Sequence, residues 1–163
     1  MSKRILLTEA GSYSVELDTI LTESAMVNGA DKIFSCPCYP LDTLTGNNRI
    51  YPSSEMVPAA KTLTEAAKSG QTSFPCTADG HPPEEFPEPI RASHKVLESW
   101  AQGGHLWIKF KVLDTASGRD LLSLIQEGDK LGISIRGLGA LNGNCVTDYT
   151  LLGADFVAIP STG

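Results

Sequence analysis

The chain has 163 residues, 41% of them hydrophobic and 20% charged, with a formal net charge of −6 at pH 7. We therefore expect a single globular domain over residues 1–163. No cluster of Lys and Arg could neutralise a row of phosphates, which argues against a nucleic-acid or anionic-membrane partner. No apolar run is long enough to cross a membrane, and charges interrupt the N-terminus too early for a signal peptide, so we expect a cytosolic protein.

The first half of the chain predicts few regular elements. Residues 1–30 contain a short apolar opening at 5–7 and an alternating stretch at 15–18, which suits a half-buried strand. Residues 32–36 predict a strand, and the prolines and glycine that follow predict an irregular connection up to 52. Apolar residues recur at helical spacing over 53–67, and Gly70 marks the C-cap of this helix.

The second half predicts more strands. Five prolines in residues 74–89 predict a loop, and residues 90–100 and 105–113 then predict two strands around a Gly103-Gly104 turn. An amphipathic helix is expected at 119–127, and further strands at 131–137 and 156–160. These elements predict an α+β domain built on a largely antiparallel sheet or barrel with flanking helices.

The cysteines and histidines predict neither a metal site nor a cofactor. Only one residue separates Cys36 from Cys38, whereas zinc-binding pairs are usually separated by two or more, and the histidines also lack ligand spacing. We expect Cys36, Cys38, Cys76 and Cys145 to be free thiols.

Ser134 is a potential nucleophile within Gly132-Ile133-Ser134-Ile135-Arg136-Gly137. Because side chains alternate along a strand, burial of the flanking isoleucines would leave the Ser134 hydroxyl on the opposite face, which we expect to border a cleft. A serine nucleophile needs a base and donors for the oxyanion, and Arg136 and Gly137 could supply these donors. A serine on a strand is nevertheless more often an inert polar residue.

His81 is a potential general base. It lies between Asp79-Gly80 and Pro82-Pro83, so a stiff loop would present its ring, and an imidazole titrates near neutral pH. A solvated loop histidine is the alternative interpretation. Asp155, His94 and Asp79 could each orient such a base, and their spacing does not choose among them.

Six segments in series resemble the prohead core proteases of T-even-type tailed phages, relatives of the herpesvirus assemblin proteases. They contain Asn48-Arg49-Ile50-Tyr51-Pro52, Gly80-His81-Pro82, Ala92-Ser93-His94-Lys95-Val96, the stretch from Val112 to Arg119, the stretch from Leu131 to Gly139, and the stretch from Asp155 to Thr162. The matching part runs from about residue 47 to the C-terminus. One departure is Gly80, because this family has an acid directly before its His-Pro pair.

The resemblance implies a serine endopeptidase with an assemblin-like barrel, acting in the host cytoplasm inside the prohead on scaffold, core and major capsid proteins. It assigns the nucleophile to Ser134, the base to His81 and the third member to Asp155, with His94 as the alternative. Related enzymes are regulated by assembly, which is compatible with a homo-oligomer. A non-catalytic capsid or scaffold-associated module of the same fold is the main alternative function.

The same resemblance implies cleavage after Glu in (Leu/Ile)-x-Glu sequences followed by a small residue. Such sites end at Glu9 and Glu23 in the weakly structured N-terminal stretch, which we interpret as a removable segment with self-cleavage sites. Similar sequences ending at Glu65 and Glu127 lie in predicted helices, where a protease cannot thread the chain without local unfolding. A guanidinium suits recognition of the glutamate, and Arg49, Arg91 and Arg136 are the arginines considered.

Overall fold

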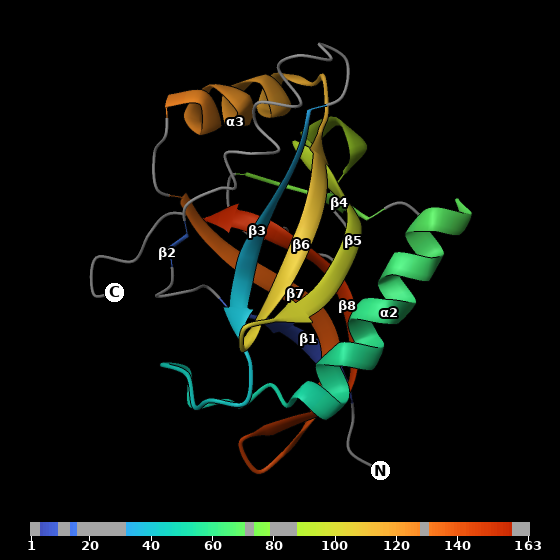
Figure 1. The fold of residues 1–163 in the computed structure, drawn as a ribbon, viewed down its shortest axis with the longest axis vertical. Helices are drawn as coiled ribbons and strands as arrows, with labels where there is room; N and C mark the ends of the chain where they lie inside the picture. The colour runs from blue at the N-terminus through green and yellow to red at the C-terminus, as the bar shows by residue number, and fades with distance from the viewer. Residues whose placement is uncertain are drawn as a thin grey trace.

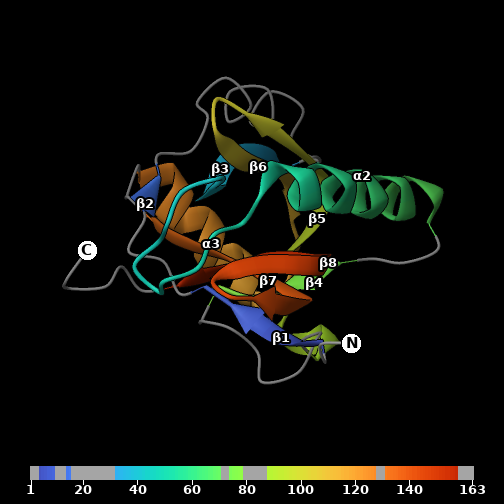
Figure 2. The ribbon, with the colours of Figure 1, turned by 90° about the horizontal axis from the view of Figure 1, so that it is seen from below.

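The structure, a computed structural model, describes residues 4–9, 14–15, 32–70, 74–78, 88–127 and 131–157. Its described strands form two four-stranded sheets, and every pairing between named strands is antiparallel. In Figure 1, β3, β6 and β5 run across the front while β7 and β8 cross behind them. Figure 2 shows the same two layers from below, with α2 along one side.

The first sheet is centred on β7. This strand, Leu131–Asn142, pairs on one edge with β8, Cys145–Val157. Two short strands, β1 (Ile5–Thr8) and β2 (Ser14–Val15), also pair with β7. Register shifts interrupt the β7–β8 pairing after Arg136 and after Leu138, and such shifts bend and twist a sheet. The described strands therefore form a curled half-barrel.

The second sheet has the order β3-β6-β5-β4. Its strands are β3 (Ile33–Pro40), β4 (Pro75–Cys76), β5 (His94–Gln102) and β6 (His105–Val112). The β5–β6 hairpin turns at Gly103 and Gly104, whose φ values of 58° and 79° are the left-handed conformation that this two-residue turn requires. This confirms the predicted turn.

Two helices complete the fold. α2, Ser53–Ser69, buries Met56, Ala59, Ala60 and Leu63 against β5 and β8, and so bridges the two sheets. It ends at Gly70, which has φ 73°, as the sequence predicts. α3, Ala116–Glu127, begins three residues earlier than predicted, because the Thr115 hydroxyl accepts a hydrogen bond from the Gly118 N–H at 2.9 Å and caps the helix. A single-turn 3-10 helix covers Pro89–Arg91.

One hydrophobic core lies between the layers. Ile133 and Ile135 from β7 are fully buried there together with Ile108 and Phe110 from β6. Both faces of β7 are buried around these residues, since Ser134 and Arg136 on the opposite face also have 0% exposure. Cys36, Cys38 and Cys76 are buried and Cys145 is partly exposed, and all four are free thiols, as predicted.

Several predicted boundaries are wrong. β3 continues through Pro37 to Pro40, because it is an edge strand and shifts register after Pro37, so the missing N–H groups are tolerated. Pro75–Cys76 is a short edge strand instead of loop, and Pro89–Arg91 is a 3-10 helix instead of the start of β5. The final strand begins at Cys145, eleven residues earlier than predicted, while residues 158–160 lie outside the described part.

Candidate functional site

Ser134 and Asp155 face each other across the β7–β8 ladder. They are direct partners in the antiparallel register, which places both side chains on the same face of the sheet. Both residues have 0% exposure. The structure therefore brings the predicted nucleophile and its predicted third partner into one buried polar cluster.

Arg136 completes this cluster as the ion-pair partner of Asp155. Its Nε lies 3.0 Å from Asp155 Oδ2 and its Nη2 3.4 Å from Oδ1, and Arg136 is also fully buried. Gly153, the cross-strand partner of Arg136, makes room for the guanidinium, since a Cβ there would lie 3.0 Å from Nη2 and 2.6 Å from Cys76 Sγ. Burial alone would lower the Arg136 pKa, but the hydrogen bonds and charge of Asp155 raise it.

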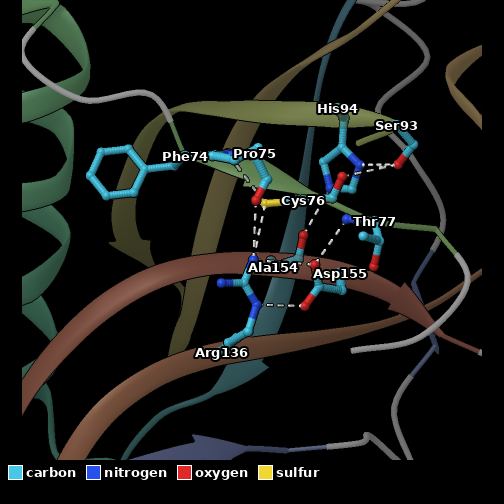
Figure 3. A network of polar contacts seen from close by, with 9 residues as sticks. All are labelled: Phe74, Pro75, Cys76, Thr77, Ser93, His94, Arg136, Ala154 and Asp155. Carbon is cyan, nitrogen blue, oxygen red and sulfur yellow. Dashed lines mark hydrogen bonds and ion pairs between the residues drawn. The ribbon is translucent and has the colours of Figure 1, made fainter. Parts of the chain in front are cut away.

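The segment around β4 lies over this polar face (Figure 3). The Thr77 N–H donates to Asp155 Oδ1 at 3.0 Å, and the Thr77 carbonyl accepts from the Phe156 N–H at 2.9 Å. Arg136 Nη2 also donates to the Pro75 carbonyl at 3.2 Å. The expectation that the Ser134 hydroxyl borders a cleft is wrong for this structure, because Ser134 has 0% exposure. Thr77 and Pro75 contact its neighbours Asp155 and Arg136 on the same face.

His94 lies on the other side of β8, in the aromatic core. Its ring packs edge-on against Phe110 and Phe156 at centroid distances of 5.3 and 5.0 Å. Nε2 lies 2.8 Å from the Ala154 carbonyl, an acceptor only, so Nε2 carries the proton and Nδ1 accepts from the Ser93 hydroxyl at 2.7 Å. Burial lowers the pKa of His94 to about 4, so the ring is neutral at pH 7.

The residues considered as oxyanion donors differ in their surroundings. The Arg136 guanidinium points towards Asp155 and Pro75. Gly137 lies at a register shift of β7, and a Cβ there would be 2.3 Å from the Tyr149 ring, so this position accepts only glycine.

Glu9 and Arg49, predicted as a self-cleavage residue and a substrate-binding residue, contact each other. The Glu9 carboxylate has 0% exposure and forms an ion pair with Arg49 Nη1. Asn47 Nδ2 donates to Glu9 Oε2 at 2.6 Å, and the Tyr51 hydroxyl donates to Oε1 at 2.5 Å. Arg91, by contrast, is exposed at the end of the 3-10 helix.

His81 and Glu23 lie outside the described residues, so their predicted roles remain predictions. Three residues that the structure brings to these sites were not predicted from the sequence: Asn47, Tyr51 and Thr77. A signal existed for two of them. Asn47 and Tyr51 each lie two residues from Arg49 in the sequence, although the segment is not a regular strand, since residues 46–48 form a turn with φ 59° at Asn48.

No group of three or more His, Cys, Asp or Glu side chains within the described part of the chain could hold a metal ion. Among the described helices, none combines the length and apolar character needed to cross a membrane.

The fold is similar to that of the bacteriophage T4 capsid assembly protease gp21. The two structures match with a TM-score of 0.74 over 97% of this chain and 99% of the phage protein, at 20% sequence identity. No protein-family model and no curated protein matches the sequence. The structural match confirms the resemblance at the level of the fold, which is half-barrel β structure with two helices.

Proposed function

We propose that the chain is a serine endopeptidase that cleaves scaffold and capsid proteins in a phage prohead, with Ser134 as nucleophile and His81 as general base. The observation that supports this most directly is that Ser134 lies opposite Asp155 on the adjacent strand, and that Asp155 accepts a hydrogen bond from Thr77, four residues before His81. The fold shared with a capsid assembly protease agrees with this activity.

Asp155 connects the nucleophile to the segment that carries the base. Its carboxylate holds the Thr77 N–H, and Thr77 precedes His81 by only four residues. Four residues span at most about 14 Å even when fully extended. Because Asp155 lies directly opposite Ser134, this chain length is compatible with the proposed contact between His81 and Ser134.

In the proposed mechanism, the His81 imidazole removes the Ser134 proton as Oγ attacks the scissile carbonyl carbon. The Gly137 N–H and Arg136 stabilise the oxyanion that develops on the carbonyl oxygen. His81 then donates its proton to the leaving amine, which breaks the C–N bond and leaves an acyl-serine. A water molecule, deprotonated by His81, attacks the ester, and the serine recovers its proton as the acid product leaves.

Asp155 is the third member in this proposal. It holds both the Thr77 backbone and the Arg136 guanidinium, so it positions the His81 segment relative to β7. His94 suits this role less well, since both ring nitrogens are already hydrogen-bonded, one to the Ala154 carbonyl and the other to the Ser93 hydroxyl.

For specificity, we propose cleavage after Glu in (Leu/Ile)-x-Glu sequences followed by Ala, Gly or Ser, with Arg49 as the principal recognition residue and self-cleavage after Glu9 and Glu23. The ion pair between Arg49 and Glu9 supports this assignment. The matching sequences at Glu65 and Glu127 lie in α2 and α3 and are protected by helical structure.

Incubation with a scaffold-type peptide that contains Leu-Thr-Glu-Ala tests the activity. We expect cleavage after Glu by the unaltered chain, and a loss of at least about 1,000-fold in kcat/KM with Ser134→Ala or His81→Ala. Ser99→Ala is the matched control, because Ser99 is also a buried strand serine and donates to the Trp107 carbonyl. His105→Ala controls for the loss of a histidine. Both should retain activity.

Intact-mass measurement of the unaltered chain and of Ser134→Ala tests self-cleavage, since identical N-termini in both would contradict it. If no peptide is cleaved by the unaltered chain in any assembly state, the result favours a non-catalytic module of the same fold.

A further inference from the structure

A built carboxylate-binding site surrounds the side chain of Glu9. Three side chains from one short segment, Asn47, Arg49 and Tyr51, donate to its two oxygens; we call them the carboxylate cradle. Both carboxylate oxygens are satisfied and Glu9 is fully buried, whereas the Arg49 side chain is 27% exposed. The cradle thus has an open side at Arg49.

The cradle is held by contacts that do not involve the N-terminal strand. Ile50 exchanges backbone hydrogen bonds with the β7–β8 hairpin, from its N–H to the Asn144 carbonyl at 2.8 Å and from the Val146 N–H to its carbonyl at 2.9 Å. The Arg49 carbonyl accepts from the Thr45 N–H at 3.0 Å. The Tyr51 ring packs between Tyr39 and Tyr149, at centroid distances of 5.2 and 5.7 Å. Removal of Glu9 would therefore leave the three donors in place.

The residues before Glu9 are bound in the manner of an extended peptide. β1 pairs with β7 from Ile5 opposite Gly139 to Thr8 opposite Arg136, and the Glu9 N–H continues the ladder to the Ile135 carbonyl at 3.3 Å. The next residue along β7 is Ser134. Backbone pairing for affinity combined with a pocket for one side chain is how proteins recognise peptides by strand addition.

The edge of β7 beside Ser134 is occupied from both directions. The β1 pairing reaches Arg136 on one side, and β2 pairs with Gly132 and Leu131 on the other. The register differs by two residues between these pairings, since Thr8 lies opposite Arg136 and Ser14 opposite Gly132. A second peptide could pair with this part of β7 only after the N-terminal strand leaves.

We infer that the carboxylate cradle is the subsite that recognises a glutamate of an extended peptide paired with β7, and that the chain's own residues 5–9 occupy it as a competing strand. A purely structural role explains the cradle less well, because a buried ion pair adds little net stability over an apolar contact. The inference rests on the proposed function for the identity of the peptide, and it adds the recognition site and its self-occlusion.

Binding to the inactive Ser134→Ala chain tests this without cleavage. The probe is a fluorescein-labelled peptide with the sequence of residues 5–10, Ile-Leu-Leu-Thr-Glu-Ala, compared by anisotropy with its Gln analogue. Adding Glu9→Ala should lower the Kd at least 10-fold by vacating the cradle, and Glu9→Gln should lower it by less. Glu98→Ala, which removes a carboxylate on β5 of the other sheet that pairs with Lys68 of α2, should leave the Kd unchanged.

Arg49 provides the second arm. In the Ser134→Ala, Glu9→Ala background, Arg49→Ala should reduce the preference for Glu over Gln at least 10-fold, while Arg119→Ala, which removes an exposed arginine paired with Asp114, should not. Hydrogen exchange gives a readout independent of affinity, because saturating peptide should accelerate exchange in residues 5–8 of the Ser134→Ala chain. Unchanged affinity and unchanged exchange in folded variants would overturn the inference.

The inference and the proposed function fail differently. Glutamate-selective binding that depends on Arg49, without cleavage by the Ser134-containing chain, would contradict the proposed function and support the cradle as a recognition site. Cleavage after Glu that is unchanged by Arg49→Ala would support the proposed function and contradict the cradle as the recognition site.

Discussion

Two buried carboxylates in the β7 sheet are each held by an arginine, and their settings differ. Asp155 pairs with Arg136 on the adjacent strand, and both residues have 0% exposure. Glu9 pairs with Arg49 on a loop, Glu9 belongs to the N-terminal strand, and the Arg49 side chain is 27% exposed. The first pair joins two long central strands, whereas the second joins a short edge strand to a loop.

The difference indicates that the Asp155–Arg136 pair is a permanent part of the structure (the framework pair). In the Glu9–Arg49 pair (the exchangeable pair), another carboxylate can replace Glu9. Separating Asp155 from Arg136 would leave an uncompensated charge inside the protein, which is costly. Separating Glu9 from Arg49 returns one carboxylate to water and leaves a guanidinium that solvent already reaches, so the cost is smaller. A protein can use the same kind of carboxylate–arginine ion pair as a permanent structural contact in one place and as a releasable contact in another.

The largest predicted effect is on the framework pair. Asp155→Ala should lower the free energy of unfolding by about 3–5 kcal/mol, because Arg136 stays buried without its counter-charge. Urea unfolding measures this. The matched control is Asp114→Ala, which breaks an exposed pair with Arg119 and should cost less than about 1 kcal/mol. Equal losses of unfolding free energy in the two variants would contradict the distinction between a buried structural pair and an exposed surface pair.

A second prediction concerns His94, next to the framework pair. Burial lowers the His94 pKa to about 4, against about 6.5 in the unfolded chain, so only the unfolded state takes up this proton as the pH falls below 6.5. Stability is therefore fully present above about pH 6.5 and declines towards pH 4. From pH 7 to pH 5 the loss from His94 alone should be about 2 kcal/mol.

The His94→Gln variant isolates this contribution, because other titrating groups affect both proteins alike. Urea unfolding of parent and variant at pH 7 and pH 5 should show a smaller pH-dependent loss in the variant, and parallel losses would mean that His94 is not buried neutral.

The smallest predicted effect is on the exchangeable pair. Glu9→Ala should lower the free energy of unfolding by about 1–2 kcal/mol, mainly because the buried Tyr51 hydroxyl loses its acceptor. Urea unfolding beside Asp155→Ala provides the comparison. A loss as large as that of Asp155→Ala would place Glu9 in the framework and argue against its displacement by a peptide.

Local sequence patterns predicted the elements whose conformation depends on residues within the element itself. The helix α2 follows from apolar spacing and ends at Gly70, whose left-handed backbone a glycine adopts easily. The β5–β6 hairpin follows from Gly103-Gly104 for the same reason. In both cases the signal lies within a few residues of the structure that it specifies.

The long β7–β8 hairpin was not predicted beyond its two ends. Residues 138–144 are rich in glycine, alanine and asparagine, which have low strand propensity. The small residues are needed because the Tyr149 ring crosses β7, where a Cβ on Gly137 or Gly139 would lie 2.3 or 3.1 Å from it. The Asn142-Gly143 turn signal was present, but its meaning depended on strands that packing stabilises.

The sequence by itself determined α2, the central strands and the mainly antiparallel β class, because periodicity and turn residues are local properties. Side-chain chemistry made Ser134 and Asp155 candidates, and the family resemblance chose Asp155 over His94. Only the tertiary structure decided that Asp155 pairs with Arg136, that the Thr77 N–H donates to Asp155, and that Glu9 lies in the carboxylate cradle. Each of these contacts joins segments from 19 to 78 positions apart. Strand register and packing create such contacts, and no short window of sequence contains them.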